Sequence, residues 1–322
     1  MKTRCNYRMI FMAIAMAVLI TGAFSLPRSY AGDFDRFIMP VSNPVYNGDA
    51  RNVTMIRPIV LYQNLPDKID SIIGKVPLDG HVKGIAVQAS YAFNERFSFV
   101  AVKDGYVDSK PDKTLSDHDG LADLAAGLQY SFYYAPKQNA IMTARVVVEL
   151  PIGDDDVFQG NGNGNIVPSI LFLKGIDKLQ FSGALGFVIP LDSDEVNTLF
   201  YDSWHLSYAV TDWLRPLVEL NHFHVLNAGD RDVPAAGLGA LGTSKEDDLV
   251  AGIAKFSGCD IINLGGKHND EHRDLVTLAL GARVRPLKWL DLGAAYEFPL
   301  TDKENSLIEN RFMMDAVITF NF

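Results

Sequence analysis

Polar and apolar side chains alternate along much of the chain, most clearly in its last segment, residues 312–322. One set of alternate positions there is apolar: Phe312, Met314, Ala316, Ile318, Phe320 and Phe322. The other set is largely polar and includes Arg311, Asp315, Thr319 and Asn321. Because successive side chains of a strand point to opposite faces, this segment predicts a strand with one apolar and one polar face. The same period of two recurs in residues 121–132, 140–150, 214–225 and 290–298.

The connections between these segments are of two kinds. Short turns join paired strands at residues 94–96, 135–139, 176–178, 211–213 and 286–288. Long polar connections separate the pairs at residues 63–81, 107–119, 153–165, 192–199, 228–273 and 301–309. Five short-turn hairpins, an opening strand near residues 53–62 and the closing strand make twelve strands. This arrangement is typical of outer-membrane barrels, so we predict an all-β fold, a transmembrane antiparallel β-barrel with about twelve strands.

Two stretches fit the strand pattern less well. Residues 67–73 are expected to form a short helical turn within a loop, although helical periodicity is otherwise nearly absent. Residues 249–256 fit either a further strand or a packed segment of the loop, and the pattern does not choose between them.

The first 31 residues predict a secretory signal peptide. Lys2, Arg4 and Arg8 precede an apolar stretch at residues 9–20, and Ala31 ends a small-residue cleavage motif. A retained membrane anchor is the alternative, but the apolar stretch is short for a spanning helix. Cleavage after Ala31 would leave residues 32–322 as a single outer-membrane barrel domain. Residues 32–52 are expected to be a periplasmic segment ahead of the first strand.

Charge and cysteine content exclude several classes of protein. The net charge is −10, and removal of the signal peptide takes away four basic residues and no acid, which gives −14. Such an acidic chain is not expected to bind nucleic acid or to be held on anionic lipid by a basic face. Only Cys259 remains after cleavage, so no intramolecular disulfide is expected. No later stretch is long and apolar enough to predict a transmembrane helix.

The closing strand also predicts a partner. A terminal aromatic residue with apolar residues at every second position before it resembles the strand that barrel-assembly machinery recognises. The residues that would form this assembly signal are Phe312, Met314, Ile318, Phe320 and Phe322. Outer-membrane lipid is the second expected partner, in contact with the apolar faces of the strands.

Charged residues on the polar faces are the main candidates for function. They are Arg145, Glu149, Arg215, Glu219, Arg283, Arg285, Glu297, Arg311 and Asp315. A basic side chain facing lipid at mid-membrane would cost about 2–4 kcal/mol, so these charges should line the lumen. Two interpretations are open. The charges could set solute selectivity in an open or gated channel, or pair across the lumen and brace a plugged barrel.

Three other clusters contain possible metal ligands. The aspartates at 154–156, followed by the Gly/Asn run at 160–165, offer oxygen ligands for Ca²⁺ but suit an exposed loop better. The pair His268 and His272 lies four residues apart where no helix is predicted, so a metal site is not favoured. His222 and His224 share an outer strand face, beyond the apolar band near the outer rim, and are not expected to bind metal.

No enzyme is predicted. The chain lacks the G-x-S-x-G motif of a nucleophile elbow. His205 and Ser207 share a predicted inner face, where lumen-lining polar residues are favoured over a hydrolase site. We therefore expect no catalytic residue, no metal and no cofactor.

A resemblance to a known family is carried by several strand-and-turn motifs. They are Leu121-Ala122-Asp123-Leu124 with Tyr130, Glu149-Leu150-Pro151-Ile152-Gly153-Asp154, Asp260-Ile261-Ile262-Asn263-Leu264-Gly265, Asp274-Leu275-Val276-Thr277, Ala295-Tyr296-Glu297-Phe298-Pro299-Leu300-Thr301-Asp302 and Glu309-Asn310-Arg311. On these residues the chain resembles the outer-membrane transporters grouped with the MetA-pathway phenol-degradation family. The resemblance covers most of the mature chain. It implies a barrel that passes small hydrophobic or aromatic compounds, and it assigns no site residues.

The leading hypothesis is an outer-membrane channel that passes small solutes, hydrophobic or aromatic ones among them, by passive diffusion. The loop at 228–273 is long enough to fold inward as a constriction. The alternative is a structural or surface-interaction barrel with long acidic extracellular loops and no transport. A barrel enzyme is the third and least favoured interpretation.

Overall fold

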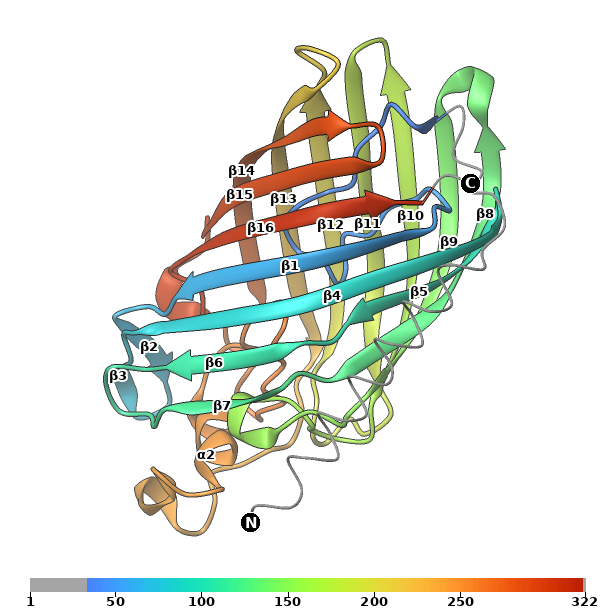
Figure 1. Ribbon diagram of the computed structural model, residues 1–322. Coiled ribbons are helices and arrows are strands. Elements are labelled where there is room, and N and C mark those ends of the chain that lie inside the picture. Colours follow the sequence, from blue (N-terminus) through green and yellow to red (C-terminus); the bar gives the residue numbers. More distant parts are fainter. Residues whose placement is uncertain (1–33, 321–322) are drawn as a thin grey trace, which may run out of the picture.

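The computed structural model describes residues 34–320 and shows a closed antiparallel β-barrel of twelve strands (Figure 1). The predicted fold is therefore confirmed. The first strand, β1 (Met55–Asn64), pairs with the last strand, β16 (Asn310–Thr319), on one side and with β4 (His81–Asn94) on the other, which closes the sheet. The predicted signal peptide lies outside the described residues.

Two of the twelve barrel strands are interrupted. β5 (Phe97–Lys103) and β6 (Tyr106–Lys110) follow each other along β4, and β7 (His118–Leu121) and β8 (Leu124–Ala135) do the same beside them. The other strands run without a break and each pairs with its neighbours in sequence: β9 (Ala140–Leu150), β10 (Asn165–Ile176), β11 (Leu179–Pro190), β12 (Thr198–Tyr208), β13 (Leu214–Asn227), β14 (Asp274–Leu287) and β15 (Leu290–Pro299).

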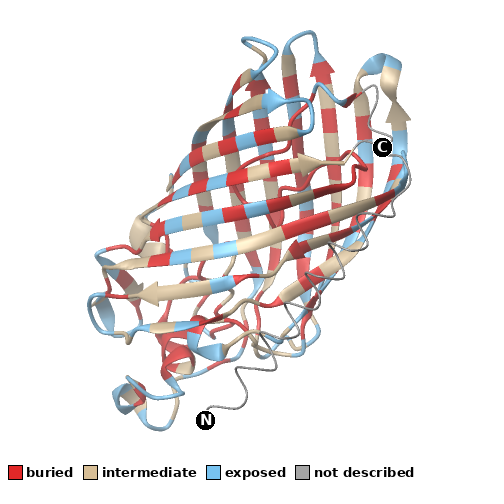
Figure 2. Ribbon diagram, viewed as in Figure 1, coloured by how far each residue is buried: buried red, intermediate tan, exposed pale blue. Residues whose placement is uncertain are grey.

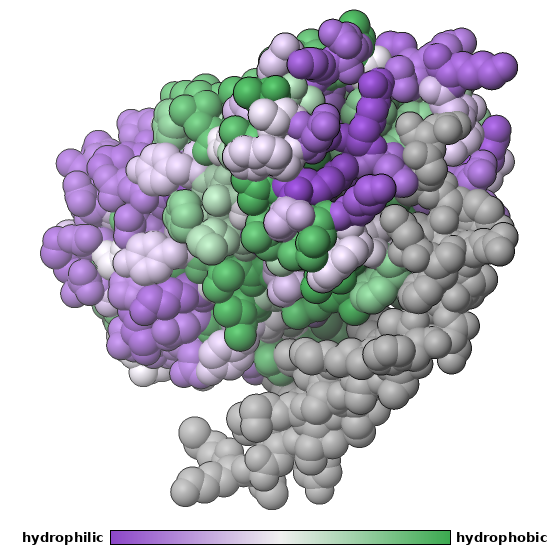
Figure 3. Space-filling model, turned by 45° about the horizontal axis from the view of Figure 1, so that its top comes forward, coloured by the Kyte–Doolittle hydropathy of each residue, from purple (hydrophilic) through white to green (hydrophobic). Residues whose placement is uncertain are grey.

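The wall has the two faces that the alternation predicts. Along each strand buried residues alternate with exposed or half-buried ones (Figure 2). On β16, for example, Met313 is 1% exposed, whereas its neighbours Phe312 and Met314 are 44% and 48% exposed. Figure 3 shows apolar side chains over the middle of the visible wall and hydrophilic ones toward its ends. A lipid-facing apolar band of this kind is what a membrane barrel requires.

Short turns lie at one end of the barrel and long loops at the other (Figure 1). We call these the short-turn end and the long-loop end. The short turn after β8 contains the 3₁₀ helix η2 (Pro136–Gln138). The long loops carry the hairpin β2 (Lys68–Ser71) and β3 (Gly74–Pro77), the helix α2 (Glu246–Ile253) and the 3₁₀ helices η3 (Asp155–Val157), η4 (Gly237–Ala240) and η5 (Lys303–Asn305).

Two local expectations differ from the structure. Residues 67–73 form no helical turn, because most of them belong to the β2–β3 hairpin, whose reversal uses Gly74 at φ +101°. The start of the stretch 249–256 is helical, because residues 249–253 form the end of α2. It is therefore neither of the two alternatives, a strand or a loop segment. This helix is short, and Leu249, Val250 and Ile253 are all buried, so packing rather than intrinsic propensity stabilises it. Within residues 34–320 no helix is long and apolar enough to span a membrane.

Residues 34–54, which we call the plug segment, lie inside the barrel. This segment is the dark blue trace that crosses the interior in Figure 1, and every residue from 37 to 54 is buried. It contacts the wall first at the short-turn end, passes into the lumen and returns to begin β1. The sequence predicts a periplasmic segment at residues 32–52, and since this segment has no period, its packing inside the barrel is not visible in the pattern.

Candidate functional site

All nine of the predicted lumen charges point inward. Eight are buried, with exposures between 0% and 8%, and Arg285 is half-buried. Ions buried to this degree are stable only when they are paired and hydrogen-bonded. The partners of each charge therefore show whether it is free to meet a solute or is committed to the structure.

The Asp315 carboxylate pairs with two arginines, and both arginines bind the backbone of the plug segment. Arg57 Nε lies 2.6 Å from Asp315 Oδ2, and both terminal nitrogens of Arg283 lie 2.7 Å from the same carboxylate. Both arginines also donate to the plug carbonyls of residues 39–41 at 2.6–3.0 Å. One acid and two bases thus hold the plug backbone against β1, β14 and β16.

The Glu219 carboxylate binds the next part of the plug. It accepts hydrogen bonds from the amides of Val41 and Ser42 at 2.9 and 2.6 Å and from the Ser42 hydroxyl at 2.6 Å. Its other neighbour is His205 Nδ1, at 2.7 Å, and His205 Nε2 lies 3.0 Å from Ser207 Oγ. Hydroxyl, imidazole and carboxylate follow the order of a hydrolytic triad. Here, however, the carboxylate anchors main chain, and all three side chains are at most 3% exposed.

Two further arginines hold the plug from other strands. Arg145 donates to the carbonyls of Val45 and Tyr46 at 3.3 and 3.0 Å. Arg285 forms a bidentate pair with Asp291, at 2.5 and 2.7 Å, and donates to the carbonyl of Phe37 at 3.1 Å. These bonds satisfy carbonyls that an irregular buried segment would otherwise leave without partners.

The loop at 228–273 folds inward from the opposite end. Its Asp260 lies 2.8 and 2.5 Å from the Arg311 guanidinium, which also contacts Gln63 at 2.7 Å and Glu297 at 3.4 Å. Burial raises the pKa of the neighbouring Cys259 thiol to about 12, so that thiol is protonated and unreactive at neutral pH. The constriction expected from the length of this loop is present.

Four predicted charges form no direct hydrogen bond to the plug or to this loop. Asp315 and Glu297 act through arginines that do, because Asp315 binds Arg57 and Arg283 and Glu297 lies beside Arg311. The other two are Glu149 and Arg215. Glu149 pairs with Lys103 at 2.8 Å, and Lys103 also lies 3.7 Å from Asp123. Arg215 donates to the carbonyl of Asp212 at 2.9 Å, near the short-turn end. Of the two open interpretations, the structure thus favours the braced and plugged barrel.

Three important partners were missed by the sequence reasoning. Arg57 lies on the inner face of β1, and the same alternation could have found it. Lys103 stands at the end of β5, where the strand is interrupted and alternation stops being a guide. Asp260 lies in an irregular loop, and no local pattern indicates that it reaches Arg311.

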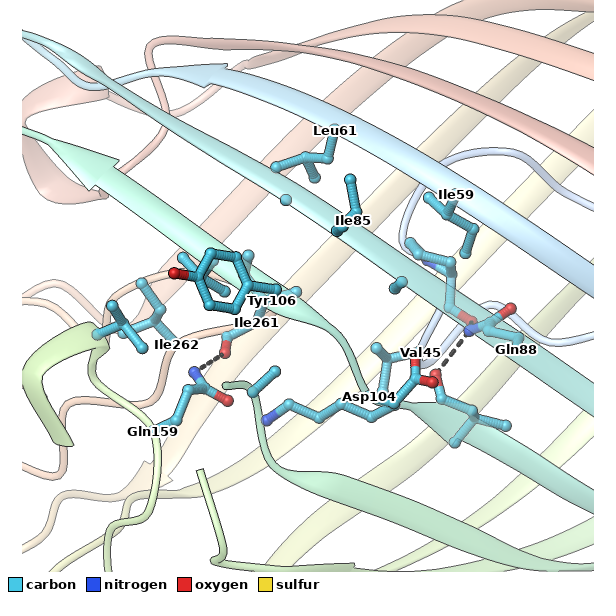
Figure 4. A pocket seen from close by; sticks show the side chains of 18 residues that line it. Val45, Ile59, Leu61, Ile85, Gln88, Asp104, Tyr106, Gln159, Ile261 and Ile262 are labelled. Carbon is cyan, nitrogen blue, oxygen red and sulfur yellow. Dashed lines mark hydrogen bonds between the residues drawn. The ribbon is translucent and has the colours of Figure 1, made fainter. Parts of the chain in front are cut away.

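An apolar cavity of about 80 Å³ lies in the lumen beside β1, β4 and β6 (Figure 4). The plug closes it on one side with Pro44 and Val45, and loop residues Gln159, Ile261 and Ile262 close it on another. Gln159 donates to the Ile261 carbonyl at 2.8 Å, which joins two long loops over the cavity. Most wall residues of the cavity are small or apolar, among them Ile59, Leu61, Gly84, Ile85, Ala86 and Tyr106, and the polar ones are Gln88, Lys103 and Asp104.

The wall is irregular beside this cavity. Between β5 and β6 the strand is interrupted at Asp104 and Gly105. There the Val87 amide donates a hydrogen bond to the Asp104 carboxylate, at 2.8 Å, and not to a strand carbonyl. Gly105 adopts φ +121°, and a Cβ there would lie 2.3 Å from the Ile85 carbonyl oxygen. The sheet can make this interruption only with glycine at that position.

A second apolar hollow, of about 470 Å³, lies on the outer face of the same part of the wall. Residues of five strands form it, among them Val60, Ile85, Tyr106, Leu292 and Met314. The inner cavity and the outer hollow share five lining residues: Ile59, Ile85, Ala86, Asp104 and Tyr106. A single layer of residues therefore separates the lumen from the lipid-facing surface here.

Two other clusters from the sequence, the aspartates at 154–156 and the pair His268 and His272, do not bring their side chains to one point. Asp154 accepts the Leu121 amide at 2.7 Å and so caps a loop. His272 contacts Asp70 at 2.9 Å, whereas His268 contacts Glu271 at 3.4 Å. Neither cluster gathers three possible metal ligands among residues 34–320.

The predicted assembly residues lie on the outer face of β16 as far as they are described. Phe312 and Met314 are exposed, and Ile318 and Phe320 are half-buried. Phe322 lies outside the described residues. Their recognition by assembly machinery stays a prediction.

Fold and lumen together define a class: a closed twelve-stranded barrel of the outer-membrane type with a plugged interior. No protein-family model matches the chain, and no curated protein does. Among solved structures it is similar to the COG4313 outer membrane channel from Pseudomonas putida F1, with a TM-score of 0.56 and 17% identity over 88% of this chain and 100% of that chain.

The chain is also similar to the NanC porin, with a TM-score of 0.48 and 5% identity over 82% of this chain and 100% of that one. At 17% identity, the similarity to the COG4313 channel shows the fold alone. The resemblance to the phenol-degradation family therefore stays a prediction.

Proposed function

We propose that this protein is an outer-membrane channel that passes small hydrophobic solutes by passive diffusion, through the side of its wall. The observation that carries the proposal is the apolar lumen cavity, which one layer of residues separates from an apolar hollow on the lipid-facing surface.

An axial route for polar solutes has little support. The charges that would line such a route are engaged: Arg283, Glu219 and Arg145 with the plug, and Arg311 with the inward loop. A polar solute would have to displace these groups and leave buried ions without partners, at a cost of several kcal/mol.

A sideways route suits an apolar solute. It would enter from the long-loop end past Gln159 and Ile261, rest in the cavity, and leave between Ala86 and Gly105 into the outer hollow. Each step keeps apolar surface away from water, which is worth about 25 cal/mol per Å². No energy source is required, because transfer into lipid is downhill.

The substrate class is the finer part of the proposal. The resemblance to the phenol-degradation family suggests small aromatic compounds, and the similar structure from Pseudomonas putida F1 is described as an outer membrane channel. The same proposal includes export by a cleaved signal peptide at residues 1–31 and recognition of the closing strand by assembly machinery.

The test fills the cavity with a larger side chain on the wall and leaves the plug residues unchanged. Ala86 faces the lumen opposite Ile59, so Ala86→Trp would fill the cavity at its wall side. Ala144, which points outward on β9, provides the matched control as Ala144→Trp. Phenol uptake into cells that express the protein would be measured together with planar-bilayer conductance of the purified barrel.

We expect Ala86→Trp to lower facilitated phenol uptake at least tenfold and to leave ion conductance unchanged. Ala144→Trp should behave like the wild type. Equal uptake by both variants would refute the sideways route. A folded wild-type barrel that passes neither ions nor phenol would instead favour the structural, surface-interaction barrel.

A further inference from the structure

A cluster of histidines and carboxylates lies on the outer face of the barrel, apart from the lumen. His222 and His224 stand two residues apart on β13, and both point outward. Asp202 lies opposite His222 on β12, and Asp274 lies opposite His224 on β14. Three neighbouring strands thus bring four polar side chains together on the surface.

Three of these side chains converge on one point. Asp274 Oδ1 lies 3.0 Å from His222 Nε2 and 2.7 Å from His224 Nδ1. All three donor atoms lie within 4.8 Å of one another. A tetrahedral zinc ion with ligands about 2.0–2.1 Å away holds its donors roughly 3.3 Å apart, so small side-chain rotations would bring these atoms to ligand distance.

The fourth residue orients the first histidine. Asp202 Oδ2 lies 2.9 Å from His222 Nδ1, and the other Asp202 oxygen accepts a hydrogen bond from Trp204 Nε1 at 2.6 Å. A carboxylate on one imidazole nitrogen selects the tautomer whose other nitrogen is free for a metal. His222 Nε2 is therefore prepared to bind an ion between itself, His224 and Asp274.

The surroundings leave the cluster negative and open. Arg273, the residue immediately before Asp274, pairs with Asp270 at 2.6 Å and not with Asp274. The side chain of Asp274 is 52% exposed, and those of His222 and His224 are 27% and 34% exposed. On β13 the outward residues toward the short-turn end are apolar, so the cluster stands at the long-loop edge of the apolar band.

We propose that His222, His224 and Asp274 bind one divalent transition-metal ion, with Asp202 as a positioning residue. Two imidazoles and one carboxylate suit Zn²⁺ and its neighbours Co²⁺, Ni²⁺ and Cu²⁺, whereas Ca²⁺ and Mg²⁺ prefer oxygen ligands only. Three protein ligands leave further positions of the ion directed outward, toward water or the lipid headgroup layer. The site serves neither the plug nor the solute route.

The test uses the full mature barrel in detergent, purified without a histidine tag. Zn²⁺ is titrated against a chromophoric chelator, and the absorption spectrum of bound Co²⁺ reports the coordination. We expect one equivalent of Zn²⁺, a tetrahedral or five-coordinate Co²⁺ spectrum, and weaker binding as the pH falls, because histidine must lose its proton to bind.

Variants assign the ligands. His224→Gln and Asp274→Asn should each weaken binding at least tenfold, and Asp202→Asn should weaken it about 10–100-fold through the lost orientation of His222. His268→Gln and His272→Gln, in the loop, are matched controls and should bind like the wild type. Heat-modified mobility on gels establishes that each variant is folded.

Three outcomes would overturn the proposal. One is a wild-type barrel that binds less than one equivalent of Zn²⁺ at micromolar concentrations. Another is equal affinity in the wild type and in the folded His224→Gln variant. The third is displacement of bound Zn²⁺ by millimolar Ca²⁺, which would show an oxygen site of a different class.

Discussion

Replacement of Glu219 by glutamine is the most direct test of how the plug is held. The side chain keeps its shape in Glu219→Gln but loses its charge and one acceptor oxygen. In the structure that carboxylate accepts three hydrogen bonds from the plug, from the amides of Val41 and Ser42 and from the Ser42 hydroxyl, at 2.6–2.9 Å. The glutamine amide group would face at least one of these donors with a donor of its own.

The magnitude follows from these bonds. A hydrogen bond to a charged group contributes about 1.5–3 kcal/mol net. The loss of one such bond and the weakening of the others should destabilise the docked plug by about 3 kcal/mol. Because about 1.4 kcal/mol changes an equilibrium constant tenfold, the ratio of undocked to docked plug should rise roughly 100-fold.

The assay is single-channel recording in planar bilayers. The wild type should remain mostly in a low-conductance state, and Glu219→Gln should enter a larger conductance state far more often. Glu149→Gln is the matched control, because Glu149 is a similarly buried carboxylate that pairs with Lys103 and not with the plug backbone. If both variants gate like the wild type, or if Glu149→Gln opens the barrel equally, the assignment of Glu219 as a plug anchor is wrong.

Three further predictions concern the loop, the plug and pH. Arg311→Gln leaves Asp260 and Glu297 buried without their cation, and we expect a loss of about 3–5 kcal/mol. Maleimide labelling of Cys259 should accelerate at pH 7 as the loop detaches; unchanged labelling would contradict this. Gly175→Ala places a Cβ 2.1 Å from the Phe37 ring, at a cost of about 1–3 kcal/mol. Hydrogen exchange in residues 34–40 should quicken, whereas Gly84→Ala, with its nearest neighbour at 3.6 Å, serves as the control. Asp70 has a pKa below its usual value of 3.8, chiefly through its hydrogen bond with His272. That contact therefore stabilises the β2–β3 hairpin above about pH 4 and is lost as the pH falls through the lower folded pKa. The protection factor of the Ile72 amide, which is hydrogen-bonded to the Ile253 carbonyl, should fall at low pH in the wild type and be low throughout in Asp70→Asn; identical pH profiles of protection would refute the link.

The strands and their faces were predictable because their signal is local. A period of two needs only the neighbouring residues, and the requirement that one face meet lipid makes the period strong. For this reason Arg283 and Asp315 could be placed in the lumen from their positions among apolar neighbours. The twelve-strand count followed from the lengths of the connections.

The plug and the inward loop were not predictable in the same way. Residues 34–54 have no regular period, and their contacts join positions far apart in the chain: Arg283 and Met39 are 244 residues apart, and Glu219 and Val41 are 178 apart. The cluster on the outer face has the same origin, since His222 and Asp274 are 52 residues apart and meet only through strand register.

The barrel, its number of strands and the inward direction of these charges are predictable from the sequence alone, because alternation is a property of adjacent residues. The three-dimensional structure was needed to show that several of those charges hold a plug, that a loop folds in from the other end, and that an apolar cavity lies against the wall. Those features arise when irregular segments meet side chains on distant strands, and nothing in the local pattern specifies which partners they find.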